Sequence, residues 1–548
     1  MVANFMSYAS AQGNGNGRAR SSHRWRPLIF VGGLAIAASA VIASTNLADE
    51  DPLPPTAGED PSRPAEIAMQ AAPSDPPVQI CDNAAVLDGP RTPPEGAVRV
   101  DVSQNLSDLT RENPAGTAFW LGPGTHTVGT EDFSQVIPKE GNTYIGAPGA
   151  ILDGQRSARY AFTGDAANVS IRHLTIENFG KPGGNPNEGV VNHNAASNWV
   201  IENNTVTNNA GAGIMVGSGN LIQNNCLKQN GQYGFNAYHP GEVVDINIIN
   251  NEIVGNNTDD WEAREEGCGC TGGGKFWAVS GGLVTDNWVH NNKGAGLWVD
   301  TNNAGLAFEG NYIANNDAEG LIYEASYNGL IRSNTFVRNG HVKGPTNPGF
   351  PTSAVYVSES GSDARVSSDY AETFEISHNV FIDNWAGVIL WENADRFAGS
   401  PANTSSGSGT LVNPSIANEA TCTAENIHSE PYVDDCRWKT MNVQVHHNMF
   451  SFDPNEMGGA CSPRNGCGFN GIFSNWGSYP AWSPYLQDVI QNAITFEQEN
   501  LFSDNTYSGP WRFIVFDQGT RVDWANWQGA PYGQDGDSVI KVQAPERR

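Results

Sequence analysis

Positive charge is scarce in this sequence. Its 548 residues include 30 Lys and Arg against 59 Asp and Glu, which gives a net charge of −29 at pH 7. Four of the arginines lie in the segment that ends at Arg26, which contains no acid, so the rest of the chain is more acidic still. Such an acidic body is a poor partner for nucleic acids and anionic membrane surfaces. It also disfavours polyanionic substrates unless a cation such as Ca²⁺ mediates the contact.

Recognisable cofactor motifs are missing as well. The Gly-rich runs lack the following helix that a phosphate loop needs, and there is no haem or flavin motif. Cys268-Gly-Cys270 has no second Cys or His pair at zinc-finger spacing. We therefore expect no organic cofactor, leave metal ligands unassigned, and keep only Ca²⁺ open as a bound cation.

The N-terminus indicates export. Four arginines up to Arg26 precede the uncharged stretch 27–48, which contains LIFVGGLAIAASAVIA. This is the pattern of a secretory signal, and the run is also long enough to span a bilayer. Residues 49–80 are rich in Pro and acids, which is typical of a disordered linker. We expect a cleaved signal or an anchor over 1–48, this linker, and one folded domain over 81–548, secreted or membrane-anchored outside the cytoplasm.

Eight cysteines in an exported chain can form four disulfides. Cys422 and Cys436 are close in sequence, as are Cys461 and Cys467, and both pairs lie in insertions between repeats. We predict these two local disulfides and leave the remaining connectivity open.

Asparagine pairs recur through the chain. In each pair the second Asn lies five residues after the first, and an apolar residue lies two residues after the first Asn. Where no insertion intervenes, the repeat has a period of about 22 with short alternating strands, which is typical of one coil of a parallel β-helix. Asn tolerates left-handed turns, and stacked Asn amides can hydrogen-bond from coil to coil. The pairs are Asn204/Asn209, Asn225/Asn230, Asn251/Asn256, Asn287/Asn292, Asn311/Asn316, Asn334/Asn339, Asn379/Asn384 and Asn500/Asn505.

Longer runs carry a family resemblance. AFWLGPGTHTV, TYIGAPGAILDG and NVSIRHLTIENFG precede the Asn coils, and WANWQGAPYGQDGDS closes them. Together, from about Cys81 to Val542, the chain resembles the right-handed parallel β-helix proteins of the pectate-lyase-like superfamily. The resemblance implies an all-β, single-stranded right-handed parallel β-helix with loop insertions. That superfamily includes lyases, glycosidases, epimerases and non-catalytic surface proteins, so the resemblance specifies fold more than function.

Two acids occupy the same place in neighbouring coils. Gly296-Leu-Trp-Val-Asp300 is followed one repeat later by Gly320-Leu-Ile-Tyr-Glu324. Strand alternation turns Trp298, Asp300 and Glu324 outward to solvent. Like charges on adjacent strands repel, so a substrate, a shared proton or a cation should compensate. Two carboxyls about 5 Å apart are what a retaining glycosidase uses. A solvated acidic face and a Ca²⁺ site are the alternatives.

Further candidates surround this pair. Lys275, one coil earlier, is expected outward near the acids, where it would hold a carboxylate ionised or contact substrate; an ordinary surface lysine is the alternative. Trp298 offers a ring for sugar stacking. The other candidates for substrate binding are Trp277 and Phe276 beside it, His239 after the preceding strand, Glu262 in an acidic insertion, and Glu359 and Glu392 at the ends of later strands.

Three functions compete at this point. The hypothesis we favour is a glycoside hydrolase that cleaves a polysaccharide through Asp300 and Glu324. The second is a polysaccharide lyase or epimerase with Lys275 as base, assisted by Ca²⁺, against which the lack of a basic groove counts. The third is a non-catalytic glycan-binding or structural protein of the cell surface. In each case we expect a polysaccharide or glycan as partner, no nucleic acid, and a monomer.

Overall fold

The computed structural model describes residues 71–541 except 266–267, 348–349, 395, 399, 401–410, 412, 419, 475–482, 484, 486 and 518. The predicted signal or anchor segment, and the predicted linker up to residue 70, lie outside the described residues. Within the described part, no helix combines the length and apolar character needed to cross a membrane.

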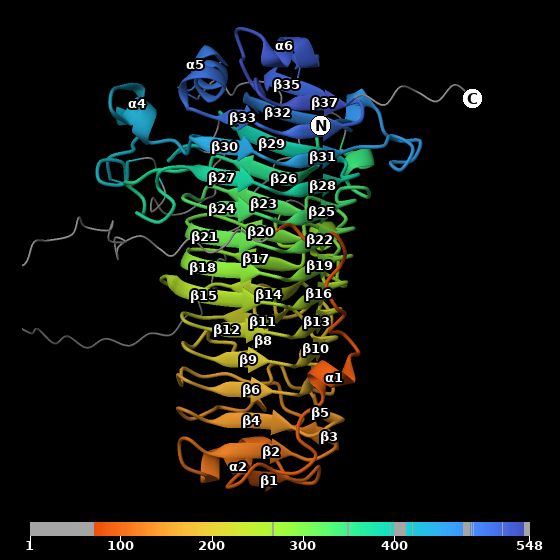
Figure 1. Cartoon of the computed structure of the whole chain (residues 1–548). Helices are drawn as coiled ribbons and strands as arrows, with labels where there is room; N and C mark the ends of the chain where they lie inside the picture. Colours follow the sequence, from red (N-terminus) through yellow and green to blue (C-terminus); the bar gives the residue numbers. More distant parts are fainter. Residues whose placement is uncertain are drawn as a thin grey trace, which may run out of the picture. The chain divides into compact units, whose positions relative to one another are not determined.

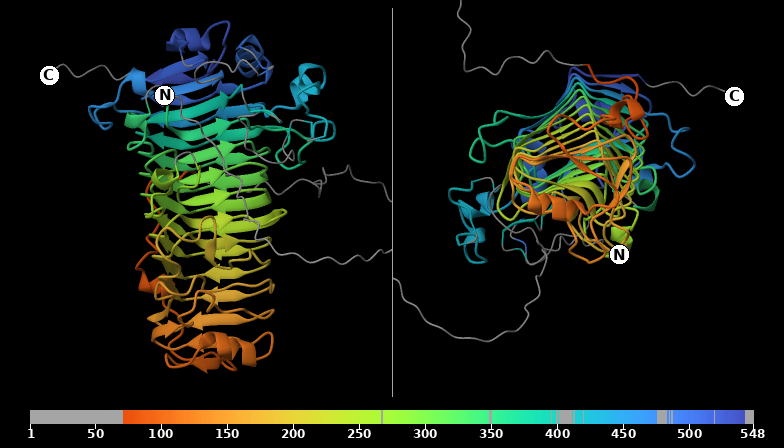
Figure 2. Two further views of the ribbon diagram at one scale, coloured as in Figure 1. Left: turned by 180° about the vertical axis from the view of Figure 1, so that it is seen from behind. Right: turned by 90° about the horizontal axis from the view of Figure 1, so that it is seen from below.

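Three long sheets wrap around one axis, and most coils of the chain contribute one strand to each sheet (Figure 1). Neighbouring strands are parallel throughout, apart from the antiparallel pair β35–β36. Seen along the axis, successive coils superimpose (Figure 2). The prediction of an all-β parallel β-helix is confirmed.

The strands of the three sheets follow in spatial order. Sheet 1 contains β1 (Val98–Val100), β2 (Ala118–Leu121), β4 (Thr143–Gly146), β6 (Ser170–Arg172), β9 (Val200–Glu202), β12 (Leu221–Gln223), β15 (Val243–Ile249), β18 (Val279–Thr285), β21 (Ala304–Glu309), β24 (Leu330–Arg332), β27 (Phe374–Ser377), β30 (Val443–His446) and β33 (Leu501–Ser503). Sheet 2 contains β3 (Gly124–Thr127), β5 (Ala150–Asp153), β7 (Thr175–Glu177), β10 (Thr205–Thr207), β13 (Cys226–Lys228), β16 (Glu252–Val254), β19 (Trp288–His290), β22 (Tyr312–Ala314), β25 (Thr335–Val337), β28 (Val380–Ile382), β31 (Met449–Ser451), β34 (Thr506–Ser508) and β37 (Val539–Lys541). Sheet 3 contains β8 (Gly189–Val191), β11 (Ala212–Val216), β14 (Tyr233–Ala237), β17 (Gly274–Phe276), β20 (Leu297–Val299), β23 (Leu321–Glu324), β26 (Ser353–Ser358), β29 (Ala386–Glu392), β32 (Phe469–Ser474), β35 (Arg512–Phe516) and β36 (Arg521–Val522).

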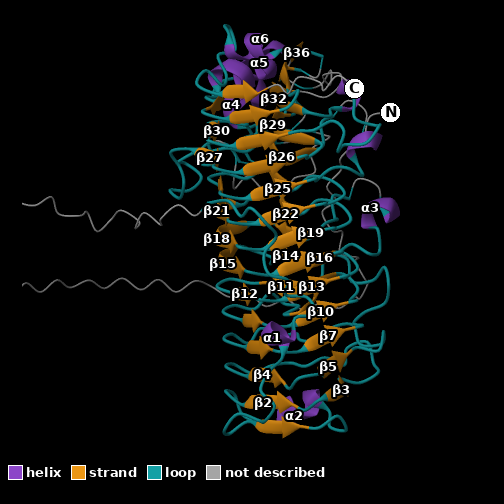
Figure 3. Ribbon diagram, turned by 45° about the vertical axis from the view of Figure 1, so that its right-hand side comes forward, coloured by secondary structure: helices purple, strands orange, loops and turns teal. Residues whose placement is uncertain are grey.

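The α-helices are short and lie at the ends, in the insertions or, in the case of α1, beside sheet 2 (Figures 1 and 3). Helix α2 lies against the first coil and α6 against the last. The helices are α1 (Ala84–Leu87), α2 (Leu106–Glu112), α3 (Trp261–Arg264), α4 (Tyr432–Asp435), α5 (Gln487–Asn492) and α6 (Trp524–Gln528).

The interior is filled by the inward positions of every strand. In sheet 3 the side chains that alternate with the outward ones, such as Leu297, Val299 and Leu321, are fully buried in one continuous core. Phenylalanine rings stack coil upon coil, as Phe336 does on Phe381 with centroids 5.1 Å apart. Burial of these columns stabilises the stack, since no coil can bury its apolar face alone.

Two ladders of buried asparagine run along the stack, as predicted. In the first, each side-chain amide donates to the amide oxygen of the next coil, for example Asn287 to Asn311 at 3.0 Å. The same Asn287 also donates to the backbone oxygens of Ile248 and Thr285. Asn448, missed in the sequence, bridges Asn379 to Asn505. The predicted pairing of Asn500 with Asn505 is therefore wrong, because Asn505 continues the first ladder rather than the second.

An N-terminal strap, residues 73–90, runs along the outside of sheet 2. Its direction is opposite to that in which successive coils follow one another along the axis. Its first contact joins the hydroxyl of Thr335 in β25 to the Pro73 backbone oxygen at 2.5 Å. Its last joins the Trp120 indole in β2 to the Pro90 oxygen at 3.0 Å. Between them the Cys81–Cys226 disulfide fixes the strap to β13. Residues 73–80, expected to be linker, thus form contacts with the coils.

All eight cysteines are paired. The two predicted local disulfides, Cys422–Cys436 and Cys461–Cys467, are confirmed. Cys268 pairs with Cys270 across a single glycine. Disulfides of this number are typical of proteins that fold outside the reducing cytoplasm.

Candidate functional site

The outer face of sheet 3 carries two neighbouring columns of side chains. The first column contains Lys275, Trp298, Ile322 and Tyr356, which are partners in register. In the second, Glu324 is opposite Ser358. Asp300 follows Val299, whose partner Tyr323 precedes Glu324. The predicted alignment of Asp300 and Glu324 on adjacent coils is therefore present in the structure.

These acids do not face solvent as predicted. Asp300 is only 4% exposed. Its carboxylate pairs with the Lys275 ammonium at 2.8 Å and accepts from the Thr301 backbone and hydroxyl. Burial alone would lower the pKa of Lys275, but the Asp300 carboxylate outweighs it, and the pKa lies above its usual value. The expected carboxylate partner of Lys275 is thus Asp300.

A second cation holds Glu324. The Arg396 guanidinium lies 2.5 Å from one Glu324 oxygen and 3.3 Å from Glu359. The other Glu324 oxygen accepts from the Trp298 indole N–H at 3.1 Å. Lys275, Asp300, Glu324, Glu359 and Arg396 form what we call the ion-pair cluster. Its two cations supply the compensation that the stacked acids require.

Glu359 in the ion-pair cluster has a strongly raised pKa. It is fully buried, and burial raises its pKa to about 7, while Arg396 and the Ser358 hydroxyl oppose the shift. Its backbone lies in the left-handed region at φ 44°. Active sites often place a carboxyl that keeps its proton near neutral pH beside carboxylates that are bound to cations. The first can then act as an acid and the others as bases or nucleophiles.

The ring of Trp298 is held on several sides. The Lys275 ammonium lies 4.6 Å from its centroid, a cation–π distance. Gly269 approaches so closely that a Cβ there would fall 2.9 Å from Trp298 Cη2. The Gly269 carbonyl in turn accepts from Lys275 at 2.6 Å. The half-buried Trp298 therefore belongs to the ion-pair cluster's wall, with part of its ring left exposed.

The family described as "right handed beta helix region" matches residues 140–274 and 188–371 of the chain. The chain is a right-handed parallel β-helix protein.

Solved structures with similar folds include three carbohydrate-related proteins. The mannuronan C-5 epimerase AlgE4 A-module of Azotobacter vinelandii is 14% identical, with 67% of this chain and 94% of that chain covered and a TM-score of 0.39. XylC in complex with xylose is 11% identical, covers 81% and 83%, and has a TM-score of 0.43. The catalytic domain of a GH87 α-1,3-glucanase with nigerose is 11% identical, covers 84% and 70%, and has a TM-score of 0.39. No curated protein sequence matches the chain.

Some of the predicted site residues lie outside the ion-pair cluster. Phe276 is fully buried in the core, edge-on to Phe235 and Phe308, so its proposed stacking role is wrong. Trp277 remains half-buried at the sheet edge, 5.9 Å from the Lys275 ammonium. His239 is exposed in the turn after β14.

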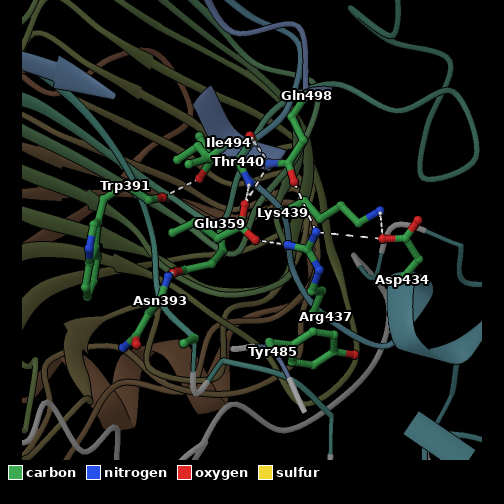
Figure 4. Close-up of polar contacts among 12 residues, drawn as sticks. Glu359, Trp391, Asn393, Asp434, Arg437, Lys439, Thr440, Tyr485, Ile494 and Gln498 are labelled. Carbon is green, nitrogen blue, oxygen red and sulfur yellow. Dashed lines mark hydrogen bonds and ion pairs between the residues drawn. The ribbon is translucent and has the colours of Figure 1, made fainter. Parts of the chain in front are cut away.

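Glu262 and Glu392 differ in their surroundings. Glu262 lies half-buried in α3, within the insertion that also supplies Gly269. Glu392, 1% exposed, pairs with Arg437 and accepts from the Thr440 backbone and the Gln498 amide; Figure 4 labels these three partners. Because every one of these contacts is internal, Glu392 serves to fasten the insertion after β29 onto the β-helix.

Sequence reasoning missed two members of this region. Arg396 lies in a long insertion without repeat, so no register placed it. Tyr233, in β14, is fully buried, and its hydroxyl has no hydrogen-bond partner among the described residues. Burial raises its pKa to about 12, while the nearby Lys275 charge opposes the shift. Its position at the start of a strand gave no signal of this proximity.

Proposed function

We propose that the protein is an exported carbohydrate-active enzyme that hydrolyses a polysaccharide at the ion-pair cluster. The observation that carries this proposal is the cluster of Asp300, Glu324 and Glu359 beside Trp298, with the cations of Lys275 and Arg396 paired to them. Glycoside hydrolysis needs one carboxyl to hold a proton and another to be ionised. Four disulfides support action outside the cytoplasm.

Roles within the ion-pair cluster follow from exposure. The Glu324 side chain is 12% exposed, against 5% for Asp300 and none for Glu359. We therefore assign the contact with the sugar to Glu324, with Asp300 on the adjoining coil as the second carboxylate. Glu359 is a positioning and proton-holding group that acts through Arg396 and Glu324, because it cannot reach a substrate itself.

An aromatic cluster on the following coils supports binding of an extended glycan. Phe350, Tyr356 and Trp391 are partly buried, and their ring centroids lie 5.6 to 6.0 Å apart. Tyr356 and Trp391 lie in the same two columns as Trp298 and Glu324. Aromatic rings beside carboxylates are suited to stacking on sugar faces, so these coils are the proposed further subsites.

The surroundings of Lys275 favour hydrolysis over a lyase or epimerase reaction with Lys275 as the base. A general base at neutral pH needs a lowered lysine pKa, whereas the pKa of Lys275 is raised by its contact with Asp300. Lys275 therefore serves to bind and orient rather than to abstract a proton.

The test is a panel of neutral and acidic polysaccharides, with Glu324→Gln as the variant. We expect new reducing ends without the ultraviolet absorbance of unsaturated uronates, and a loss of about 10²-fold or more in the variant. Glu309→Gln is the matched control, since Glu309 also forms an ion pair, at 2.8 Å to Arg332, but on sheet 1. Unsaturated products would identify a lyase, C-5 inversion without cleavage an epimerase, and glycan binding with no turnover a non-catalytic protein.

A further inference from the structure

Three histidines gather where sheet 1 turns into sheet 2, away from the ion-pair cluster. His446 ends β30 and His447 follows it, while His378 follows β27 one coil earlier. The Nδ1 atoms of His446 and His447 lie 2.8 Å apart. The His378 ring stacks on His447, with centroids 5.0 Å apart and an interplanar angle of 13°. The core and ladder contacts do not require any of these rings.

The repeat places a carboxylate beside this pair. His378, His447 and Asp504 each precede an asparagine of the first ladder and share the same left-handed turn, at φ 56°, 55° and 52°. They therefore stack in one column, with Asp504 on the coil after His447. Asp504 is exposed, and its charge acts on His446.

We propose that His446 and His447 bind a late first-row divalent cation, Cu²⁺ or Ni²⁺, through their Nδ1 atoms, with Asp504 as the third protein ligand. Metal–imidazole bonds of about 2.0–2.1 Å place two ligands at right angles about 2.9 Å apart, and tetrahedral ligands about 3.4 Å apart. The observed 2.8 Å fits the right-angle case, which Cu²⁺ and Ni²⁺ prefer in square-planar or octahedral sites.

The third ligand has to move into place. Among the described residues, no three His, Cys, Asp or Glu side chains already converge at ligand distances. Two acids act on His446 through their charges, Glu375 and Asp504. The Glu375 carboxylate accepts hydrogen bonds from Thr373 and Ser377, whereas the Asp504 side chain is exposed. Water completes the coordination of a cation bound in this way.

The repeat itself supplies the variants for a test. His446→Ser copies Ser377 and Ser503, which are its partners in register. His447→Asn copies Asn203, Asn224 and Asn250, which occupy the same left-handed turn position on earlier coils. Both substitutions should therefore preserve folding, which circular dichroism of the full chain checks.

Binding of Cu²⁺ or Ni²⁺ alone is measured by calorimetry, and the Cu²⁺ site by electron paramagnetic resonance. We expect one equivalent with two nitrogen ligands in the wild type. Each single variant should weaken affinity at least 10-fold and remove one nitrogen, and Asp504→Asn should weaken it several-fold. His378→Asn should bind as the wild type does.

Two outcomes overturn the proposal. If the double variant His446→Ser/His447→Asn binds the cation unchanged, the short contact between the two Nδ1 atoms is only a hydrogen bond. A loss in His378→Asn equal to that in His447→Asn would also overturn the ligand assignment.

Discussion

Removal of the Asp300 charge should destabilise the β-helix substantially. In Asp300→Asn, the Lys275 ammonium keeps its buried position, 11% exposed, but loses the carboxylate at 2.8 Å. Breaking one side of a buried ion pair costs about 3–5 kcal/mol, because a charge is left without a partner in a poorly solvated place. The cation–π contact with Trp298 and the Gly269 carbonyl remain, so we expect the lower end of this range, about 3 kcal/mol.

Chemical denaturation of Asp300→Asn, Lys275→Met and the double variant measures this cost. The double variant should be more stable than Asp300→Asn alone, because it removes the stranded charge together with its partner. Single-variant losses under about 1 kcal/mol, or a double variant that only adds the two losses, would refute the buried-pair reasoning.

Other parts of the structure give three more expected outcomes. The pKa of Glu359 is raised from 4.5 to about 7 in the folded state, so the folded protein keeps a proton that the unfolded chain loses. The free energy of unfolding should therefore fall by about 3 kcal/mol as pH rises from about 4.5 to 7. In unfolding measured against pH, Glu359→Gln should abolish this slope. Cys81→Ser/Cys226→Ser opens a loop with a sequence separation of 145 and should lower the free energy of unfolding by up to about 5 kcal/mol. Cys461→Ser/Cys467→Ser, with a separation of 6, should lower it by about 2 kcal/mol. Thermal unfolding that ranks the two variants the other way would contradict the loop-entropy account. Asn287→Ala should cost about 2–4 kcal/mol, because it leaves buried backbone groups of two coils without partners. Asn526→Ala, at an exposed position of α6, should cost under about 1 kcal/mol. Equal unfolding midpoints for the two variants would argue against the ladder as a source of stability.

Periodicity explains what could be predicted from the sequence. The inward columns and the Asn ladders repeat every coil, so register follows from spacing, as Leu297 over Leu321 and Asn287 over Asn311 illustrate. That register also placed Asp300, Glu324, Lys275 and Trp298 on one face. Only the last Asn pair failed, where a long insertion separates Asn448 from Asn505.

The insertions account for the errors in the candidate site. Strand alternation predicts which side chains point outward from the sheet, but it does not predict which loops cover them. Arg396 comes from the insertion after β29 and Gly269 from the one before β17, and together they bury residues that alternation assigns to solvent. Such insertions carry no period, so neither the pairing of Arg396 with Glu324 nor the burial of Glu359 could be predicted from spacing.

The N-terminal strap changes how a stack of coils can come apart. A solenoid held only by contacts between neighbours unfolds from its ends, as a one-dimensional chain of nearly independent units. Here the segment from Pro73 to Pro90 ties β25 to β2, and the Glu252 carboxylate accepts both the Ile80 and Cys81 amides at 2.7 Å midway. The first coils therefore cannot fray without releasing contacts far along the axis. This long-range tie should merge the N-terminal half into a single cooperative unit in hydrogen exchange.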